Sequence, residues 1–134
     1  MRAVFDTNVL VSALMNPYGS PGRILDLMLS RAFVVLRDDR ILREYRDVLL
    51  RPRFGFDPAD LVLLFDYVER AGEYVAAARL NVVLPDATDL PFLEVAAAGR
   101  ADALITGNVR HYKPRRGHHS VNITSPAYFL RRLV

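Results

Sequence analysis

The feature that most constrains the fold is a short apolar run that stops at a carboxylate. Residues 3–5 are Ala-Val-Phe, Asp6 follows directly, and the pattern from Thr7 onward is helical. A buried strand joined at once to a helix is typical of α/β folds, which bind ligands at the carboxyl ends of their strands. A charge at such an edge is unfavourable unless water, hydrogen bonds or a cation compensate it. Asp6 is therefore expected in a functional site.

Strand patterns and helix patterns alternate along the rest of the chain. Further strands are expected at 33–36, 103–106 and 122–124, with a weaker candidate at 74–76. Helices are expected at 21–30 with Ser20 as N-cap, at 39–50 with Asp38 as cap, at 58–71 with Asp57 as cap, at 90–98, and from 126 to the end. Because strands separated by helices form parallel βαβ units, we predict an α/β fold, a three-layer α/β/α sandwich around a central, mainly parallel sheet.

The bulk properties predict one domain that spans residues 1–134. This length can bury a core without staples, and the absence of cysteine excludes disulfides, thiolate zinc sites and cysteine nucleophiles. The sequence shows neither a signal-peptide pattern nor an apolar stretch near the roughly 20 residues of a membrane span. A cytoplasmic protein outside the membrane is therefore expected.

The basic residues favour, mildly, an anionic partner. The net charge is +3, and Arg110, Lys113, Arg115 and Arg116 form a cluster that could contact phosphates. Lys113 is the one lysine of the chain. Nearly all basic residues are therefore arginine, which has two alternative explanations. One is selection for bidentate phosphate contacts, and the other, which is favoured, is a coding preference for arginine.

Three polar side chains are expected near Asp6. Asn108 follows a later strand as Asp6 follows the first, Asp89 opens a helix, and Glu44 lies on or beside the apolar stripe of the helix at 39–50. Carboxylates that converge on one cleft repel each other unless a cation lies among them. Such oxygen ligands suit Mg²⁺ or Mn²⁺, which can activate water and stabilise a phosphodiester under attack. The pattern predicts metal-assisted hydrolysis of a phosphate ester.

Taken together, these segments resemble the successive acidic motifs of PIN-domain nucleases. The motifs are Asp-Thr-Asn-Val-Leu-Val-Ser-Ala at 6–13, the helical Glu44, Asp-Leu-Pro-Phe-Leu-Glu-Val-Ala at 89–96 and Ala-Asp-Ala-Leu-Ile-Thr-Gly-Asn at 101–108. The likeness extends to Ile-Thr-Ser-Pro at 123–126 and is greatest for the VapC-like toxins of bacterial and archaeal toxin–antitoxin pairs. The order and spacing of the motifs make it specific.

The resemblance implies a metal-dependent endoribonuclease. In such an enzyme Asp6, Glu44 and Asp89 bind Mg²⁺ or Mn²⁺ and align a water for attack on an RNA phosphodiester. A fourth acid often follows the Thr-Gly turn in this family, whereas this chain has the uncharged Asn108. We therefore expect one tightly held ion, with Asn108 supporting its shell. The resemblance further implies a homodimer and an antitoxin protein that blocks the site.

Other residues are expected to support this site. Thr7 and Asn8 could orient the Asp6 carboxylate by hydrogen bonding, and Thr106 is a strand-end hydroxyl that could reach the metal shell. Arg110 and Arg116 would guide the RNA backbone.

Structural explanations stand beside these functional ones. Asp6 and Asp89 are good helix caps, Glu44 could pair with Arg40 one turn earlier, and Asn108 could be a plain turn residue. Three further acids are expected to be solvated or capping residues: Asp86, Glu94 and Asp102.

Two other functions remain open. An aspartyl-phosphate phosphatase also uses an Asp after its first strand as nucleophile, but it needs a second Asp two residues later, where this chain has Asn8. Alternatively, a PIN-like domain that has lost turnover through Asn108 serves as an RNA-binding or antitoxin-binding module.

Overall fold

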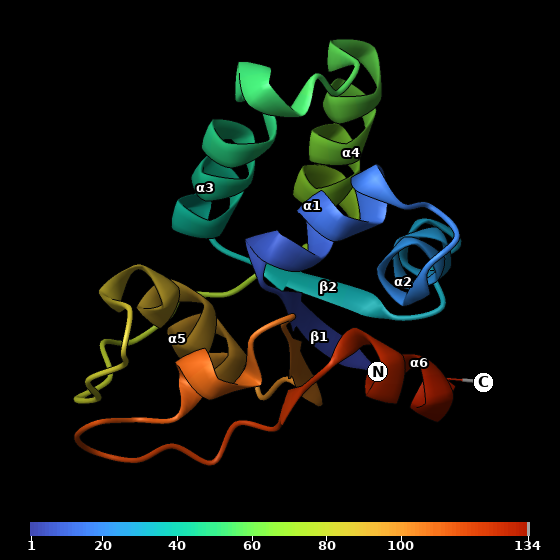
Figure 1. The fold of residues 1–134 in the computed structure, drawn as a ribbon. Helices are drawn as coiled ribbons and strands as arrows, with labels where there is room; N and C mark the ends of the chain where they lie inside the picture. Colours follow the sequence, from blue (N-terminus) through green and yellow to red (C-terminus); the bar gives the residue numbers. More distant parts are fainter. Residues whose placement is uncertain (134) are drawn as a thin grey trace.

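The fold is a parallel sheet between layers of helices (Figure 1). A computed structural model of the chain describes residues 1–133. Within that range the strands are β1 (Arg2–Phe5), β2 (Val34–Arg37), β3 (Glu73–Tyr74), β4 (Ala103–Ile105) and β5 (Ile123–Thr124). They pair in parallel in the order β3-β2-β1-β4-β5. The predicted α/β fold is confirmed.

Helices cover both faces of this sheet. They are α1 (Thr7–Met15), α2 (Ser20–Leu29), α3 (Asp39–Leu49), α4 (Pro58–Ala71), α5 (Leu90–Ala98) and α6 (Pro126–Leu133). Three short 3₁₀ turns are η1 (Pro52–Phe54), η2 (Ala87–Asp89) and η3 (Val109–Tyr112). Helices α1 to α4 lie on one side of the sheet and α5 lies on the other, while α6 packs against α2 (Figure 1). This arrangement confirms the three layers.

The first strand is the centre of the sheet. Ala3, Val4 and Phe5 are almost completely buried, as is typical of a parallel strand covered on both faces. The chain adds β2 and β3 on one side of β1 and then crosses to add β4 and β5 on the other. The boundary between β1 and β4 is therefore the switch point at which α/β sheets place their ligands. Asp6 lies there, and its N–H donates to the Ile105 carbonyl at 2.9 Å.

Two of the predicted caps form as expected. Asp38 accepts a hydrogen bond from the Ile41 N–H at 2.9 Å, and Asp57 accepts one from the Ala59 N–H at 2.9 Å. Each bond satisfies a backbone donor that the first helical turn leaves free.

Other local boundaries differ from the predictions. Ser20 is the first residue of α2 and Gly19 holds the N-cap position, so the predicted Ser20 cap is wrong. The second and third strands lie within a residue or two of the predicted positions, at Val34–Arg37 and Glu73–Tyr74. Strand ends depend on which backbone groups find partners in the neighbouring strand, and a single-strand pattern does not contain that information.

None of the helices among residues 1–133 is both long enough and apolar enough to cross a bilayer.

Candidate active site

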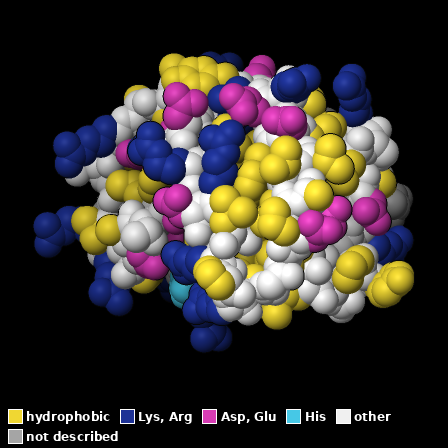
Figure 2. All heavy atoms as spheres, turned by 90° about the horizontal axis from the view of Figure 1, so that it is seen from above, with side chains coloured by type: hydrophobic (Ala, Val, Ile, Leu, Met, Phe, Trp, Pro, Cys, Tyr) yellow, Lys and Arg dark blue, Asp and Glu magenta, His cyan; other side chains and the backbone are white. Residues whose placement is uncertain are grey.

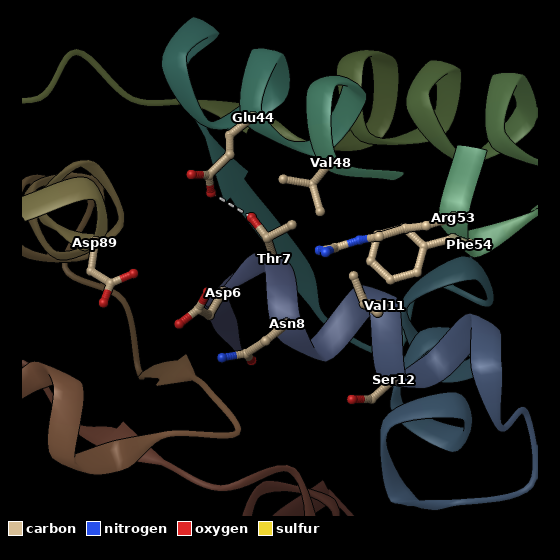
Figure 3. A pocket seen from close by; sticks show the side chains of 10 residues that line it. All are labelled: Asp6, Thr7, Asn8, Val11, Ser12, Glu44, Val48, Arg53, Phe54 and Asp89. Atoms are coloured by element: carbon tan, nitrogen blue, oxygen red, sulfur yellow. Dashed lines mark hydrogen bonds between the residues drawn. The ribbon is translucent and has the colours of Figure 1, made fainter. Parts of the chain in front are cut away.

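Three of the predicted acids line one cavity of about 360 Å³ at the carboxyl end of β1. Asp6 comes from the end of β1, Glu44 from α3, and Asp89 from η2 at the start of α5. Figure 3 shows the three carboxylates turned toward the same space. The remaining residues of the lining are Thr7, Asn8, Val11, Ser12, Val48, Arg53 and Phe54.

The elements that carry these acids are tied together by buried contacts. Tyr45, the neighbour of Glu44 on α3, donates its hydroxyl to the Phe5 carbonyl at 2.5 Å. The Tyr45 ring also packs against Phe92 of α5, with 6.2 Å between ring centroids. These contacts hold α3 and α5 against the end of β1, so three acids that are far apart in the sequence face one cavity.

Asp6 is held by two hydroxyl groups. Thr106 and Tyr112 each donate a hydrogen bond of 2.9 Å to its Oδ2. The Asp6 side chain occupies the N-cap position of α1 but accepts no hydrogen bond from that helix. The capping explanation for its side chain therefore fails, and the carboxylate is oriented by the strand-end threonine and by a tyrosine from η3.

Tyr112 is a site residue that the sequence analysis missed. It is 2% exposed, and a buried tyrosine normally places its hydroxyl against a polar partner. It lies in a short 3₁₀ turn after β4, where no helical or strand periodicity marks a residue as inward-facing. The sequence offered no local signal for its contact with Asp6.

Thr106 and Asn8 fix the turn that follows β4. Besides its bond to Asp6, Thr106 Oγ1 accepts from the Asn108 N–H at 3.0 Å and from Asn8 Nδ2 at 3.4 Å. Asn8 Oδ1 accepts from the Gly107 N–H at 2.9 Å. The polar side chains after β1 thus tie the start of α1 to the end of β4.

Glu44 is half-buried and interacts with Thr7. The Thr7 hydroxyl donates to Glu44 Oε2 at 2.5 Å. The alternative ion pair with Arg40 does not form, because the Arg40 guanidinium contacts Asp38 and Glu94, each at 2.8 Å. Burial raises the pKa of Glu44, the Thr7 hydrogen bond partly opposes that shift, and the nearby charge of Asp6 adds to it.

Asp89 is the most perturbed acid of the cavity. Burial, followed by the charge of Asp6, raises its pKa to about 7. Its Oδ2 is buried and, among residues 1–133, has no hydrogen-bond donor. His111 Nδ1 is 3.6 Å from this oxygen, which is too far for a hydrogen bond. Asp89 does not cap α5 with its side chain, so a buried carboxylate oxygen remains available to a ligand.

Thr7 and Asn8 line this cavity as predicted site residues, whereas Asn108, Arg110 and Arg116 are not part of its lining. Asn108 and Arg110 line a neighbouring hollow of about 480 Å³ together with Gly107, Val109 and His111. Arg116 is exposed and pairs through its backbone with Val83. The cation that lines the acidic cavity is instead Arg53, which the sequence analysis did not select.

The position of Glu94 contradicts the prediction that it is a solvated or capping acid. It is 4% exposed and accepts from Arg40 Nη1 at 2.8 Å and from the Leu80 N–H at 2.9 Å. A solvated or capping role is therefore wrong, because α5 is buried on most of its circumference. Asp86 does cap, accepting from the Thr88 N–H at 2.9 Å, and Asp102 accepts from the Arg2 N–H at 2.8 Å.

The donor set of the cavity suits a hard divalent cation, but the acids are not closed around one. Carboxylate oxygens are the ligands that Mg²⁺ and Mn²⁺ prefer, and the undonated Asp89 Oδ2 is such a ligand. In the part of the chain that the structure describes, however, no three His, Asp or Glu side chains are arranged to hold a metal ion. The chemistry fits, and the spacing would have to tighten on binding.

Comparison with known proteins identifies the family. A family model described as "PIN domain" matches residues 2–110, so the chain belongs to the PIN domain family. PIN domains are generally nucleases, which are hydrolases, and PIN nucleases generally use divalent metal ions. This match does not distinguish the VapC-like branch from other branches of the family.

A curated relative carries no functional description. The chain is 43% identical over 53 residues to a protein of Methanocaldococcus jannaschii called "Uncharacterized protein MJ1680". The matched stretch covers 40% of this chain and 34% of that protein. The relative therefore supports common ancestry over part of the chain and assigns no activity.

Proposed function

We propose that this PIN domain is a metal-dependent endoribonuclease that hydrolyses phosphodiester bonds in RNA. The observation that carries the proposal is the convergence of Asp6, Glu44 and Asp89, from three separate elements, on one cavity. The charge of Asp6 contributes to the raised pKa values of both Glu44 and Asp89. A divalent cation would offset this repulsion, and PIN nucleases generally use one.

The chain's own residues would divide the work as follows. Bound Mg²⁺ or Mn²⁺ would activate a water and offset the charge of the phosphate under attack. Asp6, Glu44 and Asp89 would supply its oxygen ligands. Thr106 and Tyr112 hold Asp6 through Oδ2, which leaves Oδ1 for a ligand. Glu44 has the longest side chain of the three acids and so the greatest freedom to turn toward the other two.

The test is incubation of purified protein with defined RNAs, with and without Mn²⁺ or Mg²⁺. We expect cleavage only with metal, and loss of cleavage in the Asp6→Asn and Glu44→Gln variants. Asp47→Asn is the matched control for Glu44→Gln, because Asp47 lies on the same helix and is exposed. Equal cleavage by the parent and the Asp6→Asn protein would overturn the proposal.

The biological setting is a further part of the proposal. We place the protein as the toxin of a toxin–antitoxin pair, as a homodimer, and as the target of an antitoxin protein that blocks the cavity. This part depends on the resemblance of the acidic motifs to VapC-like toxins, and expression of the chain in a host without its genomic neighbour tests it. Growth arrest that requires Asp6 is the expected result.

A second candidate function is a PIN module that binds RNA or an antitoxin without cleaving. Two observations favour it: Asn108 stands where a fourth acid often stands and lies in the neighbouring hollow, and no preformed three-residue metal cluster occurs among residues 1–133. RNA binding without cleavage across Mg²⁺ and Mn²⁺ titrations would support this candidate over the nuclease.

A further inference from the structure

The acidic cavity has a second half whose chemistry differs from the first. Away from the carboxylates, its lining includes Val11, Val48 and Phe54, with the guanidinium of Arg53 and the hydroxyl of Ser12 (Figure 3). An apolar wall does not contribute to binding of a metal ion or a phosphate, because both bind polar partners. The lining therefore offers contacts to both an anionic and an apolar part of a ligand.

The local sequence explains why these side chains are presented together. Pro52 follows α3 and begins the turn η1, and Gly55 after it adopts a φ of 62°, a left-handed conformation that glycine accepts without strain. Arg53 and Phe54 lie in this turn, between the end of α3 and the start of α4. Val48, on the last turn of that helix, lines the same wall.

Phe54 is supported from behind. Its ring stacks on the Phe56 ring with centroids 5.3 Å apart and planes within 5°, and Phe56 packs against the hydrophobic core. Phe54 itself is only half-buried and lines the cavity. Phe56 stacks on this ring and the Arg53 guanidinium lies over it. Another planar group can therefore stack on Phe54 where the Arg53 side chain turns away from the ring.

Arg53 supplies a positive charge at the same place. Its guanidinium carbon lies 4.8 Å from the centroid of the Phe54 ring. Within residues 1–133 no ion pair joins this guanidinium to a carboxylate. Basic side chains occur at several places on the face seen in Figure 2. Arg53 is exposed and lines the cavity, so its guanidinium can contact an anion that enters there.

We propose that the Arg53–Phe54 half of the cavity is a nucleotide subsite: an unpaired nucleobase takes the place of the Arg53 guanidinium on the Phe54 ring, between Val11 and Val48, and Arg53 turns to contact the adjoining phosphate. The inference rests on the proposed function for the identity of the ligand, since a nucleic acid places a phosphate beside every base. A base that is paired and stacked in a duplex cannot reach such a wall, so the subsite selects single-stranded segments. The wall is mainly apolar, so stacking strength rather than sequence readout governs its preference.

The test measures binding without cleavage. The probe is a short, fluorescein-labelled single-stranded RNA, titrated by anisotropy against Asp6→Asn protein, together with a series in which one base at a time is removed and the sugar-phosphate is kept. Phe54→Leu is expected to weaken binding of the intact RNA by roughly 5- to 150-fold, the range of one base–aromatic stack. Phe54→Tyr is expected to retain binding.

The abasic series identifies the interaction as base stacking. Loss of the base at one position should weaken binding to the Asp6→Asn protein, and should have little further effect once Phe54 is Leu. Arg53→Gln should reduce the slope of log K against log salt by roughly 0.7, the value for one phosphate contact on a single strand. The matched controls are Tyr128→Leu and Arg131→Gln, because these residues form an exposed cation–π pair on α6, with 5.7 Å from guanidinium carbon to ring centroid, outside the cavity.

The outcomes separate this inference from the proposed function. If Phe54→Leu binds the intact RNA as tightly as its parent, or responds to every abasic position as the parent does, the subsite is overturned even if the protein cleaves RNA. If the Phe54 variants and the abasic RNAs bind as expected but no RNA is cleaved with any metal, the subsite is supported and the nuclease function is overturned. Far-UV circular dichroism of each variant verifies that it is folded.

Discussion

Thr106 and Asp6 face each other across the adjoining ends of β4 and β1, and the Thr106 hydroxyl donates a 2.9 Å hydrogen bond to Asp6 Oδ2. The two residues are 100 positions apart in the sequence. Thr106 is completely buried, and its oxygen also accepts from the Asn108 N–H. One side chain therefore orients the first acid and closes the turn after β4.

Replacement of this threonine tests its double role. Thr106→Val keeps the shape but leaves the Asn108 N–H without a partner and Asp6 with the Tyr112 hydroxyl alone, so we expect a loss of about 1–3 kcal/mol in the free energy of unfolding. Urea denaturation measures this loss. Thr124→Val on β5 is the matched control, because the Thr124 hydroxyl makes only a 3.4 Å contact to the Ser125 carbonyl; an equal loss in both variants would contradict the assignment.

Removal of the Tyr112 hydroxyl tests the second hydrogen bond that orients Asp6. Tyr112→Phe removes a 2.9 Å hydrogen bond to a carboxylate, with an expected cost of about 1.5–3 kcal/mol and a lower rate of RNA cleavage. Tyr67→Phe is the comparison, because it removes a 2.6 Å bond to the Met28 carbonyl far from the cavity. Tyr67→Phe should lose stability without a change in cleavage rate per folded molecule; a parallel loss of activity there would argue against positioning by Tyr112.

The raised pKa of Asp89 predicts a particular pH dependence of stability. Its ordinary value is 3.8 and its folded value is about 7, so between these values the folded protein holds a proton that the unfolded chain has released. Stability of the metal-free protein should therefore fall as pH rises from about 4 to about 7, by at most about 4 kcal/mol from this group.

Two variants isolate that contribution. In the presence of a chelator, the difference in free energy of unfolding between the parent and the Asp89→Asn protein should grow as the pH rises through this window. The variant should be the more stable of the two at neutral pH. Asp86→Asn is the control, because hydrogen bonds from Thr88 lower the pKa of Asp86 and its contribution has the opposite sign, being lost as pH falls. A flat difference curve for Asp89→Asn would show that its pKa is not raised.

A bound divalent metal ion should offset the repulsion among the carboxylates of Asp6, Glu44 and Asp89. Mn²⁺ binds the folded state and should raise the melting temperature of the parent, and it should do so more at pH 8 than at pH 6 because a proton on Asp89 competes with the metal. Differential scanning fluorimetry measures both effects. Asp6→Asn and Asp89→Asn should respond weakly, and an undiminished response in both would exclude these acids as ligands.

Much of the fold could be predicted because each element carries its own signal. The apolar run before Asp6, the proline that follows α3 and the caps at Asp38 and Asp57 are local features, and the structure contains them where the pattern placed them. The convergence of Asp6, Glu44 and Asp89 on one cavity was also expected, because strand ends of a parallel sheet share an edge and the stripe of α3 faces inward. Their role as metal ligands remains a prediction.

The wrong prediction for Glu94 and the two site residues that the sequence analysis missed have one physical origin. Glu94 appeared solvated because a single helix pattern cannot show that other segments cover its polar side, whereas Arg40 and the Leu80 N–H satisfy it in the interior. Arg53 and Tyr112 carry no periodic signal, and their contacts depend on turns that bring them to the cavity from elsewhere. Asn108 follows β4 as expected, yet the turn directs it to the neighbouring hollow.

The sequence alone therefore determined the parallel α/β sheet, the position of Asp6 at its switch point and the set of acids, because periodicity and caps are properties of contiguous residues. Only the tertiary structure decided what holds and surrounds those acids: the hydroxyls of Thr106 and Tyr112 on Asp6, the Thr7 contact of Glu44, and the apolar, arginine-bearing wall at Phe54. Those partners come from segments far apart along the chain, and their meeting depends on how whole elements pack rather than on any local pattern.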